Sequence, residues 1–277
     1  MTVWCLGSIN ADHFYGVPHL VVPGETLIVQ NHSKGLGGKG ANQSVAAARA
    51  GAEVNHIGAV GPDGEWAVEL LAGFGVDVSR VARVHAPTAH AIIQVDAAGE
   101  NAILVYSGAN MMIPIPDFAG AQPGDTLLLQ NETNGTVEAA RLAKAKGLRV
   151  VYSAAPFDAK SVQEILPFVD LLLVNELENA ALETDLGAIE IDRVVTRGAK
   201  GAEWIGVANL PAHPVTAVDT TGAGDCFAGT LAAALDSGAT KEQALRRAIV
   251  ASTLQVTKKG TADAMPLKEE VDQVIGL

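Results

Sequence analysis

The sequence predicts an α/β protein with a central, mostly parallel sheet flanked by helices. Apolar strands alternate with helical segments along most of its 277 residues, which is the pattern of such sheets. The chain is 48% hydrophobic but only 4% aromatic and contains 29 glycines, as suits a tightly packed α/β enzyme. Two short segments of alternating polarity and one hairpin interrupt this order. They do not fit the main sheet, so we expect a small, inserted β-sheet.

The elements of the main sheet follow from apolar runs and from amphipathic or small-residue segments. The predicted strands cover residues 3–9, 54–60, 126–130, 150–153, 171–174 and 191–196. The predicted helices cover residues 41–50, 63–74, 136–146, 159–166, 176–182, 225–235, 241–257 and 268–275. A β-branched run at 215–218 is expected to be extended. Ligands of such sheets bind beyond the carboxyl ends of the strands.

The inserted sheet is predicted from two pairs of short strands. Residues 12–15 and 26–32 alternate in polarity, and Pro23-Gly24-Glu25 between them is a turn signal. Residues 89–96 and 101–107 have the spacing of a β-hairpin. We expect segments of about 12–33 and 88–107 to form a lid over the site.

Charge and cysteine content exclude several classes of function. The net charge of −12 and the pI of about 4.9 argue against a nucleic-acid-binding protein. The only two cysteines, Cys5 and Cys226, are far apart in apolar runs, so a disulfide framework is not expected and a reducing cytoplasm fits best. The N-terminus shows no signal-peptide pattern, and no apolar run reaches about 18 residues, so no membrane association is expected.

The most informative stretch is the loop Gly222-Ala223-Gly224 followed by a helix from about Asp225. A glycine loop before a helix offers free N–H groups, which bind anions. A carboxylate beside an anion site can take a proton from an alcohol that attacks a phosphoryl group. The alternative is that Asp225 simply caps the helix.

A second glycine-rich loop covers residues 35–40 and is not a Walker A motif. It would let the backbone close on a small polar ligand, with Lys39 and Asn42 as donors. The alternative is a tight turn with a solvated lysine. Asn10, Asp12 and Glu132 follow predicted strands and could bind sugar hydroxyls, although each alone could be a turn or cap residue.

These residues carry a resemblance to a known family. The chain resembles the ribokinase-like (PfkB) family of sugar kinases, from Leu6 to about Pro266. Two glycine motifs, at 37–43 and 219–225, are specific to that family. Gly-Ser-Ile-Asn-Ala-Asp at 7–12 and Pro-Gly-Glu-Thr at 23–26 are similar to its ribokinase branch. The resemblance implies a single ribokinase-like kinase domain over 1–277 that includes the lid.

The resemblance implies that ATP donates its γ-phosphoryl group to the hydroxymethyl group of a pentose, with ribose the first choice. Asp225 would be the catalytic base, and Gly222, Ala223 and Gly224 would supply N–H groups. The implied substrate-binding residues are Asn10, Asp12, Gly38, Lys39, Asn42, Glu132 and Asp225. The implied nucleotide-binding residues are Asn175, Thr196, Arg197, Gly198, Ala199, Lys200, Gly201 and Gly224.

Two ions are implied in the same way. Asn175 and Glu178 would organise Mg²⁺ through water, although the same two residues could be a helix cap with an acidic first turn. A potassium ion would be held by Asp219 and by carbonyl groups of Thr221, Gln255, Lys258 and Gly260. Two features depart from the family pattern. Ala264 stands where a hydroxyl side chain commonly completes the potassium site, and residues 183–190 are too short for the usual helix.

Other interpretations stay open at this point. The acceptor could be another sugar or a nucleoside, such as fructose, 2-keto-3-deoxygluconate, adenosine or pseudouridine. A sugar or nucleotide sensor on the same fold would have no use for a base such as Asp225. An apolar outer face of the lid would pair with a second copy, so we expect a homodimer.

Overall fold

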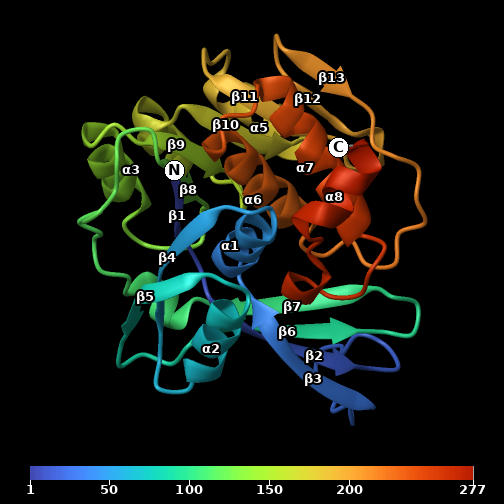
Figure 1. Cartoon of the computed structure of the whole chain (residues 1–277). Coiled ribbons are helices and arrows are strands. Elements are labelled where there is room, and N and C mark those ends of the chain that lie inside the picture. The colour runs from blue at the N-terminus through green and yellow to red at the C-terminus, as the bar shows by residue number, and fades with distance from the viewer. Residues whose placement is uncertain (277) are drawn as a thin grey trace.

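A nine-stranded sheet runs through the middle of the structure, a computed structural model that describes residues 1–276 (Figure 1). Its strands, in order across the sheet, are β13 (Ala208–Leu210), β12 (Ala202–Trp204), β11 (Asp192–Thr196), β10 (Leu171–Asn175), β9 (Arg149–Ser153), β8 (Thr126–Leu129), β1 (Thr2–Leu6), β4 (Glu53–Val60) and β5 (Asp77–Arg83). From β11 to β5 every pair is parallel, and only β12 and β13 join in antiparallel fashion. The predicted fold class is confirmed.

Both faces of this sheet are buried, as the apolar strand sequences predicted. In β1, Val3 and Cys5 belong to one core, and Trp4 and Leu6 belong to the other. All four residues are at most 3% exposed. The alternation follows from the two-residue period of a strand, which turns successive side chains to opposite faces. A strand that is buried on both faces needs apolar residues at successive positions, which explains the continuous apolar sequence of Val3–Leu6 in β1.

Helices cover the two faces in separate groups. One core is closed by α1 (Lys39–Arg49), α2 (Glu65–Gly73), α6 (Ala223–Asp236), α7 (Lys241–Gln255) and α8 (Lys268–Ile275). The other core is closed by α3 (Thr136–Ala145), α4 (Ala159–Ile165) and α5 (Glu176–Leu186). Figure 1 shows α1 and α6 side by side on the near face of the sheet. Four 3₁₀ turns complete the described helical elements: η1 (Gly108–Met111), η2 (Leu166–Phe168), η3 (Gly198–Lys200) and η4 (Ala262–Ala264).

A smaller, four-stranded sheet lies at one end of the molecule, beyond the end of β1 (Figure 1). Its order is β3 (Asn31–Gly37), β2 (Asn10–Gly16), β6 (Ala89–Val95) and β7 (Asn101–Tyr106). The β2–β3 and β6–β7 pairs are antiparallel, whereas β2 and β6 are parallel. The predicted small, separate sheet is therefore confirmed, and β1 leads directly into it. Residues that follow the end of β1 are consequently neighbours of the residues of the small sheet.

Several predicted elements differ from the structure. The strand predicted at 26–32 is wrong, because the second strand of the small sheet is β3 and includes the start of the glycine-rich loop. Strand β3 begins with four exposed, polar residues and gives no apolar signal. Residues 215–218 form no strand, and β5, β12 and β13 were not predicted. Helix α6 begins at Ala223, two residues before the predicted start. In residues 1–276, each helix is too short or too polar to cross a membrane.

Candidate active site

Asp225 lies in the first turn of α6, where the loop Gly222-Ala223-Gly224 turns into the helix. Gly222 precedes the helix with a φ of 80°, a left-handed conformation that glycine adopts readily. The N–H groups of the first turn have no partner within a helix, and the helix dipole adds positive potential there. The loop and Asp225 therefore form one site, in which N–H donors for an anion lie beside a carboxylate.

The carboxylate of Asp225 is buried and held by two amide side chains of α1. Asn42 Nδ2 donates to Asp225 Oδ2 at 3.1 Å, and Gln43 Nε2 donates to Asp225 Oδ1 at 3.0 Å. Burial raises the pKa of Asp225, the charge of Lys39 and the two hydrogen bonds lower it, and the net shift is upward. The carboxylate is consequently a stronger base than an exposed aspartate, and two donors fix its orientation.

Glycines allow the first turn of α1 to come close enough for these hydrogen bonds. A Cβ atom on Gly229 of α6 would lie 2.3 Å from the backbone oxygen of Gln43. A Cβ atom on Gly40 would lie 2.5 Å from the Cα atom of Gly7, which follows β1. The start of α1 is thus packed against both α6 and the end of β1. The close approach places the donors of α1 within reach of Asp225.

A second group of polar side chains gathers beyond the carboxyl ends of β1 and β8. The backbone N–H of Lys39 donates to Glu132 Oε2 at 3.1 Å, and Lys39 Nζ lies 3.7 Å from Glu132 Oε1. Ser8 Oγ also donates to Glu132 Oε2. On the other side, Asn110 Nδ2 donates to Asn10 Oδ1 at 2.8 Å. These contacts fix the orientations of groups that can bind hydroxyls.

Asp12 belongs to the same polar group, because its titration responds to the charges of Glu132, Lys39 and Asp225. Burial and then the negative charge of Glu132 raise the pKa of Asp12 to about 6. Among the described residues, Asp12 Oδ1 is buried and has no hydrogen-bond partner. A buried carboxylate oxygen in this condition is an acceptor available to a ligand hydroxyl.

Two adjoining pockets extend from Asp225 along the glycine loop. The first has a volume of about 260 Å³ and reaches from Lys39 and Asp225 to Asn175 and Glu178. The second has a volume of about 480 Å³ and is mostly apolar, with walls from η3, from residues 212–217 and from α7. The pockets share the lining residues Thr196, Thr220, Ala223, Gly224 and Phe227. Together they form one groove that is polar at Asp225 and apolar at the far end.

A family model for pfkB family carbohydrate kinases matches residues 2–268, nearly the whole chain. The chain belongs to the pfkB family of carbohydrate kinases. This pfkB kinase is 37% identical over 296 residues to a ribokinase of Haemophilus influenzae, which covers 97% of this chain and 96% of the relative. It is therefore a phosphotransferase that acts on a sugar hydroxyl.

Solved structures agree with the fold of the pfkB kinase. A ribokinase of Cryptococcus neoformans in complex with ADP superposes with a TM-score of 0.86 at 33% identity, and the match covers 99% of each chain. A ribokinase of Arabidopsis thaliana complexed with ribose and ATP gives a TM-score of 0.85 at 27% identity, covering 100% of this chain and 99% of the other. The match extends over both sheets, because neither chain has a large part left over.

The structure of the pfkB kinase brings most of the predicted site residues together. The predicted substrate-binding side chains lie in the polar group around Asp225, and Gly38 precedes α1. Of the predicted nucleotide-binding residues, those that line the groove are Asn175, Thr196, Gly198, Ala199, Gly201 and Gly224. The side chains of Arg197 and Lys200 form ion pairs with Glu203 and Glu176, and neither residue lines either pocket. A contact of these two residues with the nucleotide stays a prediction.

Sequence reasoning missed several residues of the site. Gln43 holds Asp225, and Asn110 accepts from Ile9 N at 3.0 Å while it orients Asn10. Gln43 stands within the glycine motif, so its neighbour Asn42 was a usable signal. Asn110 lies 100 residues from Asn10 in a 3₁₀ turn and carries no local signal. The apolar wall at 212–217 is likewise outside every motif.

Asn175 and Glu178 form the capping box of α5, and they also line the pocket that contains Asp225. Asn175 Oδ1 accepts from the N–H of Glu178 at 2.9 Å, and Glu178 Oε2 accepts from the N–H of Asn175 at 2.8 Å. The capping role is therefore present, and the magnesium-binding role stays a prediction for residues that line this pocket. Oxygen donors at a polar pocket fit Mg²⁺, which keeps several waters of its own.

The carbonyl oxygens expected to hold potassium have a different partner. Gln255 Nε2 donates to Thr221 O at 2.8 Å and to Gly260 O at 3.1 Å. An amide group between these oxygens leaves no room for an ion there, and the buried Ala264 offers no side-chain oxygen. The residues do not fit a potassium ion in this arrangement.

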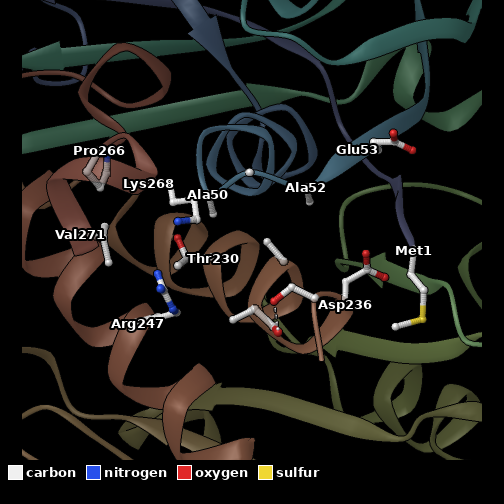
Figure 2. Close-up of a pocket in the computed structure, with 14 residues that line it drawn as sticks. Met1, Ala50, Ala52, Glu53, Thr230, Asp236, Arg247, Pro266, Lys268 and Val271 are labelled. Carbon is white, nitrogen blue, oxygen red and sulfur yellow. Dashed lines mark hydrogen bonds between the residues drawn. The ribbon is translucent and has the colours of Figure 1, made fainter. Parts of the chain in front are cut away.

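A third pocket, of about 370 Å³, lies away from all of these residues (Figure 2). Its lining comes from the ends of α1 and α6, from α7 and α8, and from Met1 and Glu53 at the starts of β1 and β4. It is therefore near the amino ends of the strands, opposite to the edge where α/β sheets bind ligands. Its cations, Arg247 and Lys268, are already paired with Asp272.

Proposed function

We propose that the protein transfers the γ-phosphoryl group of ATP to the hydroxymethyl group of D-ribose, giving ADP and ribose 5-phosphate. The observation that carries this proposal is the position of Asp225. Its buried carboxylate lies between the polar group of Asp12, Lys39 and Glu132 and the glycine loop that begins α6. A base placed between a hydroxyl-binding cage and an anion-binding loop is the arrangement that phosphoryl transfer to an alcohol requires.

In the proposed mechanism, Asp225 accepts the proton of the hydroxymethyl group as its oxygen attacks the phosphoryl group. The N–H groups of the glycine loop and the first turn of α6 stabilise the negative charge of the transferring phosphoryl group. Lys39 adds a positive charge nearby. Burial lowers the pKa of its amine, but the carboxylates of Asp225, Glu132 and Glu178 outweigh burial and raise it, so Lys39 is charged.

The groove fits a nucleotide in one direction. The apolar pocket beside α7 would hold the adenine ring, and the polar pocket would hold the phosphate groups near Gly224. Mg²⁺, when bound through Asn175 and Glu178, would offset phosphate charge. An apolar wall would have no ligand group to contact if the phosphoryl donor carried no base. It therefore supports a nucleotide such as ATP as the donor over inorganic phosphate.

The sugar is proposed from the chemistry of the cage. Its named side chains are carboxylates, amides and one amine, all of which bind hydroxyls. The Arabidopsis thaliana structure in complex with ribose and ATP supports the same choice. A nucleoside acceptor would need a surface for its base in addition to this cage.

Three further features belong to the proposal. The four-stranded sheet acts as a lid, because its strand β2 carries Asn10 and Asp12. A lid that excludes water favours the sugar over water as acceptor.

The protein acts as a homodimer through this sheet. It works in the cytoplasm, where its two free, buried cysteines stay reduced.

The proposal is tested by measuring ADP release from MgATP with a panel of acceptors. The panel contains ribose, deoxyribose, fructose, 2-keto-3-deoxygluconate, adenosine and pseudouridine. Ribose is expected to give the highest kcat/KM. Turnover on a different acceptor would keep the kinase and replace the sugar. ATP binding without turnover on any acceptor would favour a sensor.

A further inference from the structure

Gln255, the last residue of α7, has a fully buried side chain that joins two separate loops. Its Nε2 donates to the carbonyl oxygen of Thr221, before α6, and to that of Gly260, after α7. The oxygen atom of the same amide could not take this place, because it would face two carbonyl oxygens without a donor. The hydrogen-bond pattern therefore fixes which end of the amide lies between the loops.

The amide acts on the loop that would bind the phosphoryl group. Thr221 directly precedes Gly222-Ala223-Gly224, so the position of its carbonyl group sets the orientation of the peptide units that follow. Asp219 restrains the same loop, since its Oδ1 accepts from Thr221 N at 2.9 Å and its Oδ2 accepts from Gly260 N at 3.1 Å. Gln255 and Asp219 thus link the same two backbone segments, Gln255 as a hydrogen-bond donor and Asp219 as an acceptor.

Asp219 does not need a cation to balance its charge. Both oxygens of its carboxylate already accept hydrogen bonds from the backbone, Oδ1 from Thr221 N and Oδ2 from Gly260 N. The carboxylate is thus satisfied by the protein itself, so a monovalent ion would gain less here than beside a bare carboxylate.

Three of the four carbonyl oxygens that a cation would use also accept hydrogen bonds. Two of them accept from Gln255 Nε2, and the backbone oxygen of Gln255 accepts from Lys258 N at 3.0 Å. Ala264, which is 2% exposed, provides no hydroxyl group. A cation could bind between these oxygens only after the Gln255 side chain had moved away from both carbonyl groups.

We propose that the side-chain amide of Gln255 takes the place of a monovalent cation and positions the phosphoryl-binding loop, so that turnover does not depend on potassium. Gln255 would be a positioning residue, because it acts through Thr221 and lines neither pocket of the groove. The amide hydrogens supply to the two carbonyl groups the positive partner that an ion would supply. The proposal deepens the proposed function and rests on it only where turnover is measured.

The first measurement is turnover of the unaltered protein in potassium and in tetramethylammonium at equal ionic strength. The two rates are expected to agree within about twofold, since no cation site is left to fill. A severalfold increase in potassium would overturn the proposal, because it would mean that the ion displaces or recruits the side chain.

The decisive variant is Gln255→Glu, which keeps the size of the side chain and replaces the donor by a second oxygen. Three facing oxygens then need a cation between them, so potassium should restore turnover that is lost in tetramethylammonium. The loss should be about 10²-fold, the usual effect of a displaced catalytic group. Gln255→Ala, which opens the site, should show the same rescue more weakly. A merely structural role would lower turnover equally in both salts.

The melting temperature in the two salts gives a readout that does not depend on the substrate. Potassium should raise the melting temperature of Gln255→Glu and leave that of the unaltered protein unchanged. Gln243→Ala, in the first turn of the same helix, is the matched control and should show no difference between salts. If ribose gives no turnover but the melting temperatures behave as expected, the proposed function fails and this inference stands. No potassium response in either Gln255 variant would overturn the inference.

Discussion

At the scale of single residues, the site is organised by carboxylates in different environments. Asp225 is held by two amide donors, whereas Asp12 has an unpartnered oxygen among the described residues. The first arrangement orients a base, and the second leaves an acceptor open for a hydroxyl. Asp219 lies outside this pair. Against the effect of burial, backbone hydrogen bonds lower its pKa, and its carboxylate restrains the loop before α6. Three aspartates of one site therefore have three distinct roles.

Asp225→Asn removes the proposed base and keeps the shape of the side chain. Turnover should fall by about 10²–10⁴, the usual contribution of a general base. ATP binding should persist, because the glycine loop and the apolar pocket are unchanged. Single-turnover kinetics and nucleotide binding by calorimetry check both statements. A rate near that of the unaltered protein would remove Asp225 from the role of base.

Asp12→Asn tests the raised pKa of Asp12. A carboxyl group whose pKa is about 6 in the folded protein and 3.8 when unfolded favours folding below pH 3.8, and this contribution is lost as the pH rises through 6. The variant cannot ionise, so its melting temperature relative to the unaltered protein should increase between pH 4 and pH 7. Its KM for ribose should rise, because the amide replaces one of the two acceptor oxygens by an NH2 donor. A constant difference in melting temperature across this range would contradict the pKa shift.

At the scale of elements, the contact between α1 and α6 positions the amide donors at Asp225. Gly229→Ala places a Cβ atom against the backbone of Gln43 and against Ala46 of α1. Overpacking of this kind costs about 1–3 kcal/mol, although alanine gains about 1 kcal/mol over glycine within a helix. The melting temperature should fall, and turnover should fall with it as Asn42 and Gln43 shift.

Gly73→Ala is the matched control for this prediction. Gly73 ends α2, and in the described part of the chain a Cβ atom there would meet nothing within 4 Å. Its melting temperature should stay unchanged or rise slightly, because only the helix preference changes. If both variants melt like the unaltered protein, the close approach of α1 and α6 tolerates a methyl group, and the prediction is wrong.

Elements with a strong local signal were the ones that the sequence predicted. The apolar strands of the main sheet and the small-residue helices α1 and α6 are recognisable from composition alone. Strand β3 was missed because its exposed, polar residues are stabilised by pairing with β2, a contact between distant parts of the chain. The same reason explains Gln255. Its side chain reaches Thr221, 34 residues away, and no local pattern reports such a contact.

At the scale of the whole molecule, the site lies where the two sheets meet. The main sheet contributes the ends of β1 and β8, the helices contribute Asp225 and its donors, and β2 of the small sheet contributes Asn10 and Asp12. A change in the orientation of the small sheet therefore moves together the two side chains that we propose to bind the sugar. The lid proposed here would close the cage by the same movement that excludes water.

The small sheet also ends in an edge strand that a second copy can cover. All six residues of β7 are exposed, including the apolar Ile103, Leu104 and Val105, and within residues 1–276 β7 has a partner strand on one side only. An apolar edge of this kind is rarely left in water. Light scattering at micromolar concentration should therefore give about twice the 28.5 kDa of one chain. A monomer would contradict the prediction.

Leu104→Lys should shift this equilibrium to the monomer, because a charge on the edge strand opposes pairing. Leu177→Lys is the matched control, because Leu177 is 81% exposed on α5, a helix that packs on the main sheet. This variant should stay dimeric. The lid of the Leu104 variant loses its support from the second copy. Its KM for ribose should consequently rise more than its kcat falls, because Asn10 and Asp12 are the residues proposed to bind the sugar, whereas Asp225 is held by α1. A dimer that survives Leu104→Lys would place the contact on another surface.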